Sequence, residues 1–157
     1  LPALKRVKRI TSDNRSGSFV GSEFAYEDLG SQELEKYKDR KYLRKEACPN
    51  NNELECHVIS RVPTEKSSGY KYQVLWLDDT AAHKVWKIDY FDRKGSHLKT
   101  LFFDDYKIYL DKHWRPSVYK MINHQTGKST DLLVQNIRFK VGLSSRDFNP
   151  KSLSRAR

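Results

Sequence analysis

The side chains best suited to acid–base chemistry are carboxylates in two short stretches of the chain. Glu23, Glu27 and Asp28 fall in the first, and Asp104 and Asp105 fall in the second. A pair of carboxylates at a fixed separation is the machinery of glycoside hydrolysis. Nothing in the sequence sets that separation here, and acidic residues in turns are common. The pattern therefore gives no specific support for a hydrolase.

The other reactive residue types are scattered. The five histidines have no metal-ligand spacing and no HExxH motif, and no serine lies in a GxSxG elbow. These histidines are His57, His83, His97, His113 and His124. The two cysteines, Cys48 and Cys56, cannot complete a tetrahedral metal site alone. We therefore predict a protein that is not an enzyme, with no catalytic residue, no metal and no cofactor.

Composition points to an anionic partner without choosing one. The 157 residues include 30 Lys and Arg against 20 Asp and Glu, which gives a net charge of +10 and a pI near 9.6. Such a charge attracts nucleic acid, acidic lipid headgroups or acidic proteins. No apolar run approaches the ~18 residues that a membrane-spanning helix needs. The length predicts one domain, 1–157.

The elements that must position these side chains are mostly short strands joined by turns. Tyr72, Val74 and Trp76 alternate with their neighbours, as strands with unlike faces do. Turn residues follow at Pro49–Asn52, at 93–96 and at 125–128. The expected strands cover 41–48, 54–62, 72–77, 86–90, 98–103 with 106–110, 114–123, and a last long strand with Leu133, Ile137, Phe139, Val141 and Leu143 on one face.

Short connections pair neighbouring strands antiparallel, so the fold class is mostly β. We expect a curved antiparallel sheet or half-open barrel with one apolar and one solvated face. Asp104 and Asp105 would form a bulge in one long strand. A short helix at Ser31–Lys38, capped by Ser31, is the main helical signal. With so little helix, the sheet must curl on itself or be covered by other material.

Several segments along nearly the whole chain carry a family resemblance. They are LPALKRVKRI at 1–10, SFVGSEFAYEDL at 18–29, KVWKIDYFDRKG at 84–95, WRP at 114–116, NHQTGKST at 123–130 and FNPKSL at 148–153. The sequence is similar to the LolA-like outer-membrane lipoprotein-sorting family. Members of that family carry early strands and a helix before the LPALKR segment, so the resemblance implies the C-terminal part of a domain.

The resemblance implies a half-open barrel of the LolA–LolB type, with an apolar concave face that shelters acyl chains without catalysis. It also implies a signal peptide, export and location in the bacterial periplasm, with association with the outer membrane left open. Cys48 and Cys56 are not part of the family pattern. Because they flank a hairpin turn in a chain of oxidising context, we expect a disulfide between them.

An apolar set on alternating strand positions is expected to line the cavity. The same alternation would equally build an ordinary filled core. The segment GSEFAYEDL, with Phe19, Phe24 and Tyr26, is expected to act as a lid or rim loop, or to be a plug that only stabilises. The full expected lining is Phe19, Phe24, Tyr26, Trp76, Trp86, Ile88, Tyr90, Phe102, Ile108, Val118, Ile137 and Phe139.

Basic clusters offer a partner surface. Lys5, Arg6, Lys8 and Arg9 form one, and residues 36–45 form another that is interleaved with tyrosines. Single-stranded nucleic acid would suit such a surface, but no RNP1-like motif, GXXG loop or helix-turn-helix is present. We expect contact with an anionic membrane surface or an acidic partner protein instead. Self-association through the uncovered sheet is also open.

The sequence therefore predicts a periplasmic carrier or chaperone that binds lipid or lipoprotein acyl chains. A periplasmic protein-interaction or structural β domain without a lipid ligand is the alternative. A basic β domain that binds nucleic acid is the third class, and salt-dependent binding to DNA would distinguish it.

Overall fold

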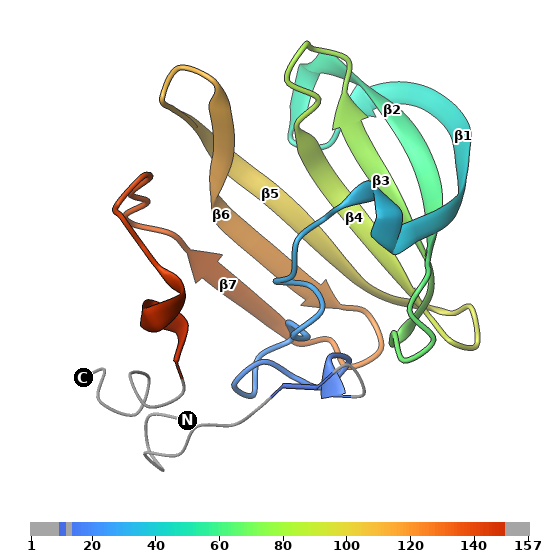
Figure 1. Ribbon diagram of the computed structural model, residues 1–157. Helices are drawn as coiled ribbons and strands as arrows, with labels where there is room; N and C mark the ends of the chain where they lie inside the picture. Colours follow the sequence, from blue (N-terminus) through green and yellow to red (C-terminus); the bar gives the residue numbers. More distant parts are fainter. Residues whose placement is uncertain (1–9, 12–13, 150–157) are drawn as a thin grey trace.

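The computed structural model describes residues 10–11 and 14–149, which form a curved, open, seven-stranded antiparallel sheet (Figure 1). Sequence neighbours are also neighbours in space, in the order β1 to β7. The strands are β1 (Tyr37–Cys48), β2 (Asn51–Pro63), β3 (Tyr70–Asp78), β4 (Val85–Asp92), β5 (His97–Tyr109), β6 (His113–Asn123) and β7 (Ser129–Leu133). The predicted mostly β class and antiparallel meander are confirmed.

Local turn chemistry fixes the hairpins. Between β4 and β5, Gly95 takes a φ of 91°, and the Asp92 carboxylate accepts the N–H groups of Lys94 and Ser96. Between β6 and β7, Gly127 has a φ of 71° and Asn123 Oδ1 accepts two following N–H groups. Glycine takes such positive φ without the clash that a Cβ would bring. Both turns lie where the sequence predicted them.

Cross-strand pairing aligns the sheet's inner residues in rows. One row is apolar and runs over five neighbouring strands, and its members are Ile59, Leu75, Ile88, Leu101 and Met121. Side chains alternate between the two faces of a strand. The residues next to them in sequence, such as Val58, Val74 and Trp76, therefore point to the outer face.

The outer face also buries a cluster, which differs from the expectation of one apolar and one solvated face. Cys48, Cys56, Val58, Val74, Trp76 and Trp86 pack together there. The two cysteines form the expected disulfide, with their Cα atoms 4.9 Å apart and both side chains fully buried. Trp76 and Trp86 donate to the carboxylates of Glu46 and Asp78, so their polar edges are paired as well.

Two strand predictions are corrected. β5 is continuous: Asp104 lies opposite Val118 and Tyr106 opposite Pro116, so no extra residue bulges between them. Asp105 has a φ of 50°, and its side chain and carbonyl accept the Ser117 hydroxyl. The last strand is short, because pairing ends after the Val134 N–H bonds to Ser117 O.

Helix is scarce, as expected, but the predicted helix Ser31–Lys38 is reduced to the 3-10 turn η3 (Leu34–Lys36). Ser31 does not cap it, and its hydroxyl accepts from the Lys36 ammonium instead. A further 3-10 turn, η4 (Ser145–Phe148), is held by a capping box between Ser144 and Asp147. Within the described residues, no helix is long and apolar enough to cross a membrane.

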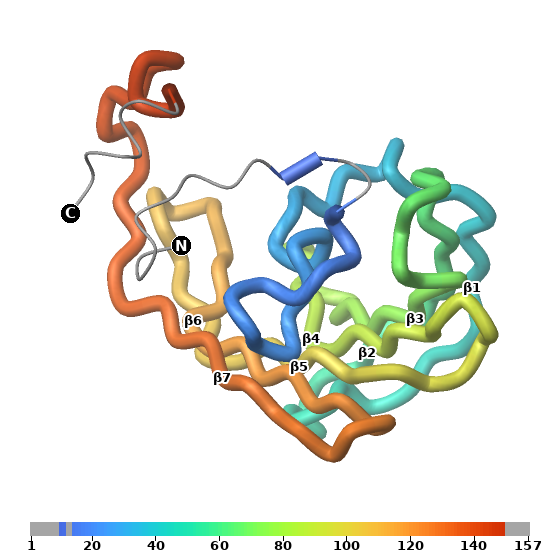
Figure 2. Tube along the Cα trace, turned by 90° about the horizontal axis from the view of Figure 1, so that it is seen from below, coloured from blue at the N-terminus to red at the C-terminus, as the bar shows by residue number. Residues whose placement is uncertain are grey.

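Residues 14–32 form a segment without regular structure that crosses the concave side of the sheet. Figure 1 shows this segment in front of β4, β5 and β6, and Figure 2 shows it inside the curve of the sheet. It covers one end of the concave face and leaves the other end open. We call residues 14–32 the plug segment.

Candidate functional site

The plug segment is anchored by one aromatic side chain. Phe24 is only 2% exposed and joins the inner core with Tyr70, Ile88 and other buried residues. Phe19 packs against the same core, and its ring lies 5.6 Å from that of Tyr26, edge to face. A side chain this buried belongs to a packed core rather than to a loop that opens and closes. Of the two expectations for this segment, the packing favours the plug.

A buried ion pair fixes the same segment to β5. Lys99 Nζ lies 2.7 Å from Asp28 Oδ2, with side chains 5% and 0% exposed. The Tyr70 hydroxyl donates to the other carboxylate oxygen at 2.6 Å, and Lys99 also donates to Glu23 O at 2.9 Å. Burial, followed by the nearby Asp28 charge, raises the pKa of Tyr70 well above its usual value. Each charge is thus paired and hydrogen-bonded, which offsets the cost of burying it.

The acidic residues of the two stretches form hydrogen bonds and ion pairs with different partners. Glu27 accepts from the Ser68 hydroxyl and the Gly69 N–H at 2.8 and 2.9 Å. Asp105 instead accepts the Ser117 hydroxyl and pairs with Lys107 at 3.1 Å. The carboxylates of the plug segment and of β5 therefore have separate partners.

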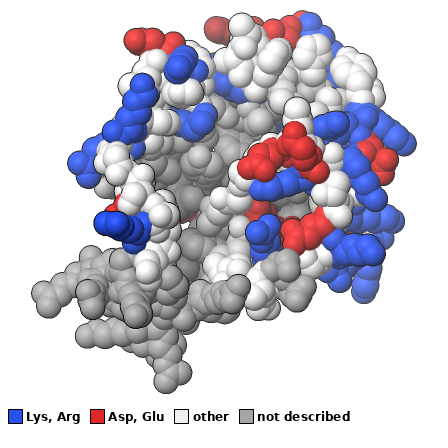
Figure 3. Space-filling view, in the orientation of Figure 1, with Lys and Arg blue, Asp and Glu red and all other residues white. Residues whose placement is uncertain are grey.

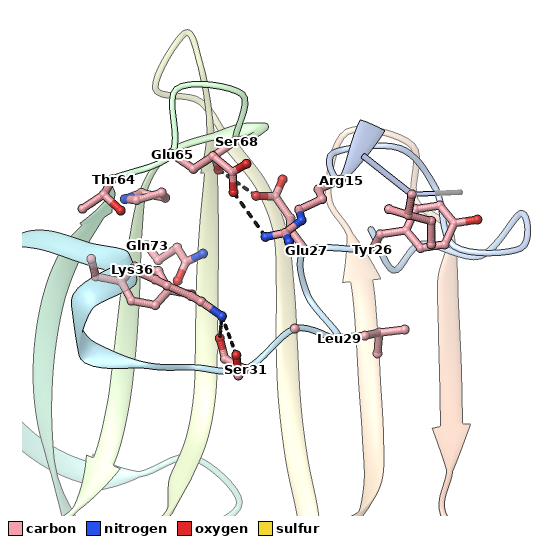
Figure 4. A pocket seen from close by; sticks show the side chains of 14 residues that line it. Arg15, Tyr26, Glu27, Leu29, Ser31, Lys36, Thr64, Glu65, Ser68 and Gln73 are labelled. Atoms are coloured by element: carbon pink, nitrogen blue, oxygen red, sulfur yellow. Dashed lines mark hydrogen bonds and ion pairs between the residues drawn. The ribbon is translucent and has the colours of Figure 1, made fainter. Parts of the chain in front are cut away.

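Glu27 lies at a small pocket of about 370 Å³ beside the plug segment (Figure 4). Arg15 approaches Glu65 at 3.4 Å across this pocket, and Lys36 contacts Ser31 on its other side. Desolvation raises the pKa of Glu27 above its usual range, although the hydrogen bonds from Gly69 and Ser68 oppose that rise. The pocket is mostly lined by groups that already have partners, so we do not assign it a ligand.

A larger hollow of about 900 Å³ occupies the open end of the concave face. Its floor is formed by apolar side chains from successive strands, namely Ile59, Leu75, Leu77, Ile88, Leu101, Phe103, Tyr119 and Leu132. Several of these, including Phe103 and Leu132, are only partly buried. Ligand sites of small molecules typically measure ≈ 300–1,000 Å³ and are mostly apolar, so this hollow has the size and lining of one.

The loops at the two mouth edges carry aromatic and basic groups. Trp114, at the start of β6, is 36% exposed and lines the hollow. Lys84 Nζ lies 4.7 Å from the centre of its ring. The loop that carries Lys84 is held by Asp78, which accepts from Thr80 and from the Lys84 N–H. The mouth is therefore built on a fixed turn.

Only some of the residues expected to line a cavity lie on the wall of the hollow. Ile88 and Tyr90 are on the wall of the hollow. Phe19 and Phe24 of the plug segment pack into the inner core, and Tyr26 of the same segment lies at the small pocket. The rest are not among the lining residues, and they are Trp76, Trp86, Phe102, Ile108, Val118, Ile137 and Phe139.

Strand alternation and one bulge explain this division. Phe102 sits between Leu101 and Phe103 and so faces the outer side. A register shift next to Val85 turns Trp86 toward the outer cluster. Phe139 lies beyond β7 and stacks on His113, with ring centres 5.5 Å apart.

A histidine cluster on the outer face was not predicted from the sequence. Thr100 donates to Asp89 at 2.6 Å, and His97 and His124 approach the same hydroxyl. The two imidazoles lie 4.3 Å apart, and desolvation together with the neighbouring His97 lowers the pKa of His124. Among the described residues, no group of histidines, cysteines or carboxylates is placed to hold a metal ion.

Basic residues gather along β1, at the edge of the sheet. Figure 3 shows lysine and arginine over this edge, and Lys38, Lys41 and Arg44 are exposed there. Arg44 and Lys45 are paired with carboxylates at 2.7 and 2.5 Å. The expected partner surface of Lys5, Arg6, Lys8 and Arg9 lies outside the described residues.

Comparison with known proteins identifies a matching family model and similar structures. A family model with the description "-like: Uncharacterized protein" matches residues 1–155. A crystal structure from Vibrio parahaemolyticus, of a domain named for outer membrane lipoprotein sorting, is 52% identical, with a TM-score of 0.87 over 98% of this chain. The chain belongs to the family that this model describes, and its fold is LolA-like.

Two further structures agree with the LolA-like fold. A DUF1329 family protein from Desulfovibrio piger ATCC 29098 is 26% identical, with a TM-score of 0.83 over 98% of this chain. A LolA superfamily protein from Nitrosomonas europaea is 17% identical, with a TM-score of 0.61 over 85% of this chain, which shows the fold alone. None of the curated proteins matches. The LolA-like chain spans 63%, 62% and 60% of the length of these three structures.

Proposed function

We propose that this LolA-like protein is a non-enzymatic carrier that shelters acyl chains of lipoproteins or other lipids in the hollow of its sheet. The observation that carries the proposal is the hollow itself, about 900 Å³ floored by apolar side chains from six strands, β2 to β7. The relative from Vibrio parahaemolyticus, named for lipoprotein sorting, supports the same role.

Burial of apolar surface supplies the driving force for such a carrier. Each methylene group that leaves water contributes about 0.8 kcal/mol. Leu77, Phe103 and Leu132 are only partly buried, so an acyl chain would cover surface that the protein alone leaves in contact with water. Binding of this kind needs shape and apolar surface, and it needs no nucleophile or metal.

The proposed compartment is the bacterial periplasm. The Cys48–Cys56 disulfide supports it, because disulfides persist in oxidising compartments and are rare in the cytosol. The relative's name, which refers to the outer membrane, is consistent with that location. The partners proposed are then a lipid or lipoprotein acyl chain, with anionic membrane surfaces or an acidic protein reached through the basic β1 edge.

Adjacent leucines on β7 offer a matched test. Leu132 lines the hollow, whereas Leu133 is 63% exposed and lies on the opposite face of the strand. Leu132→Asp would place a carboxylate against the acyl chain, where an unpaired charge is strongly unfavourable. Leu133→Asp adds the same charge to the same edge strand outside the hollow.

The measurement is calorimetric titration of each purified variant with a soluble, medium-chain lipopeptide. We expect saturable binding to the wild type and to Leu133→Asp, and a loss of at least about tenfold in Leu132→Asp. Equal binding by both variants, or no binding by the wild type, would rule the carrier function out.

A further inference from the structure

A polar row crosses the concave face beside the apolar one. Arg61, Gln73, Tyr90, Lys99 and Asn123 are successive cross-strand partners from β2 to β6. The apolar row lies two positions away along the same strands, for example at Ile59 on β2, Leu75 on β3 and Ile88 on β4. The two rows share one face of the sheet because the side chains of a strand return to the same face at every second residue. Of the polar row, Arg61 and Tyr90 line the hollow, so the hollow has an apolar part and a polar end.

The plug segment supplies carboxylates to only one half of this polar row. Its Asp28 carboxylate pairs with Lys99, and its Glu23 carboxylate accepts from Asn123 Nδ2 at 2.7 Å. Its third acid, Glu27, is bonded to Ser68 and Gly69 instead. No carboxylate of the described residues forms an ion pair with Arg61, at the other end of the row.

Arg61 is a buried cation held by neutral groups. Its residue is 6% exposed, its Nε donates to Gln73 Oε1 at 2.9 Å, and its Nη2 donates to the side-chain oxygen of Gln32. The guanidinium carbon lies 3.5 Å from the centre of the Tyr37 ring. Burial lowers the pKa of the guanidinium, which nonetheless remains protonated because arginine does not lose its proton in proteins.

The remaining donor group of Arg61, Nη1, has no hydrogen-bond partner among the described residues. The hydrogen bonds of the Arg61 side chain to described residues use Nε and Nη2. Among the described residues, every buried side-chain nitrogen and oxygen has a hydrogen-bond partner, so Nη1 is not a buried atom. Nη1 must therefore reach open space, and Arg61 is a lining residue of the hollow. A buried charge without a counter-ion is costly, and a ligand that brings the missing negative charge removes that cost.

The other charged side chains that line the hollow are also mostly positive. Arg40, Lys84, Lys112 and Arg115 also border the hollow, whereas its one acidic residue, Asp28, is already paired with Lys99. The potential inside the hollow is therefore positive, and low-dielectric walls strengthen it.

We propose that the ligand is an anionic amphiphile whose carboxylate or phosphate headgroup is bound by Arg61 while its acyl chain lies along the apolar row. Arginine suits either headgroup, because its planar fork matches the oxygens of carboxylates and phosphates alike. This inference rests on the proposed carrier function and adds the headgroup that the carrier selects.

The test compares ligands that differ only in charge. Binding of hexadecanoate and its methyl ester is measured by displacement of a fluorescent fatty-acid analogue, for the wild type and Arg61→Gln. We expect the wild type to prefer the acid by about tenfold or more, the size of one charge-assisted hydrogen bond. Arg61→Gln should bind both ligands equally, at the affinity of the ester.

Control variants keep the result interpretable. Arg61→Lys retains the charge and should keep most of the preference, whatever Arg61→Gln does to the melting temperature. Arg146→Gln removes an exposed cation of η4 that does not line the hollow and should leave the preference unchanged. A second arm compares phosphatidylglycerol, whose headgroup has a net negative charge, with zwitterionic phosphatidylcholine. Preference for phosphatidylglycerol would identify an anionic phosphate headgroup, and preference for hexadecanoate alone would identify a free carboxylate.

The outcomes separate the two proposals. If neither hexadecanoate nor its ester nor either phospholipid binds, the carrier function itself fails. If they bind without any preference for charge, the carrier stands and the assignment of Arg61 is overturned. The assignment is also overturned if the preference persists in Arg61→Gln or disappears in Arg146→Gln.

Discussion

Lys99 and Asp28 are separated by 71 residues in sequence, yet their charged groups lie 2.7 Å apart in the interior of the sheet. This contact joins β5 to the plug segment. It also determines which part of the concave face is filled and which part remains open.

Removal of one partner of this pair should loosen the plug segment. In Asp28→Asn the Lys99 ammonium stays buried without a counter-charge, and such losses cost about 3–5 kcal/mol. Urea unfolding of the wild type and the variant measures the difference. Glu33→Gln is the control, because its ion pair with Lys36 is exposed to solvent and should contribute little to stability. Equal, small effects of both changes would contradict the anchoring role of Asp28.

Phe24 should carry most of the apolar anchoring of the plug segment. Phe24→Ala deletes a ring that is 2% exposed, and such truncations cost about 3–5 kcal/mol. Val20→Ala, in the same segment but 60% exposed, should change stability by no more than about 0.5 kcal/mol. Thermal unfolding of the two variants gives the comparison. A Phe24→Ala protein as stable as Val20→Ala would show that the segment is a loose lid after all.

The disulfide should stabilise modestly. It closes a loop with a sequence separation of 8, for which the chain-entropy model gives about 2–3 kcal/mol. We expect Cys48→Ala/Cys56→Ala to unfold at lower denaturant by that amount while ligand binding is retained, because the bond lies on the face opposite the hollow. Loss of ligand binding in a folded double variant would contradict that separation of roles.

Glu27 should give stability a distinctive pH dependence. Its pKa is raised in the folded protein from a usual value of 4.5, so the folded state binds the proton more tightly than the unfolded state. Glu27 therefore contributes stability below pH 4.5 that is lost as pH rises through its folded pKa. The stability difference between wild type and Glu27→Gln, followed from pH 4 to 7, should shift against the wild type as pH rises. A shift in the opposite direction would mean that hydrogen bonds outweigh burial at this site.

Alternation and turn residues were enough to predict the sheet. Val74 and Trp76 gave the strand period, and Gly95 and Gly127 marked hairpins that the structure contains. The end of the last strand could not be predicted, because an extended edge segment such as 134–143 has the same alternation whether or not it is paired. Trp86 was expected to line the cavity but lies in the outer cluster for a related reason. One register shift reverses the face of the sheet that a side chain occupies.

The polar residues of the site were the harder part. Arg61, Gln73 and Lys99 interrupt otherwise apolar strands, and that interruption was the available signal. A polar residue within a strand is usually explained by a solvated face, so the sequence favoured that explanation. Only the cross-strand register shows that they form one buried row.

Quenching of tryptophan fluorescence by a brominated fatty acid locates the bound acyl chain. Trp114 lines the hollow, whereas Trp76 and Trp86 are buried in the outer cluster, so a bound acyl chain with bromine near its end should quench Trp114 alone. We expect saturable quenching in the wild type that disappears in Trp114→Phe, while displacement of an unbrominated probe still reports binding. Quenching that persists in Trp114→Phe, or no saturable quenching in the wild type, would contradict the claim that acyl chains bind in the hollow.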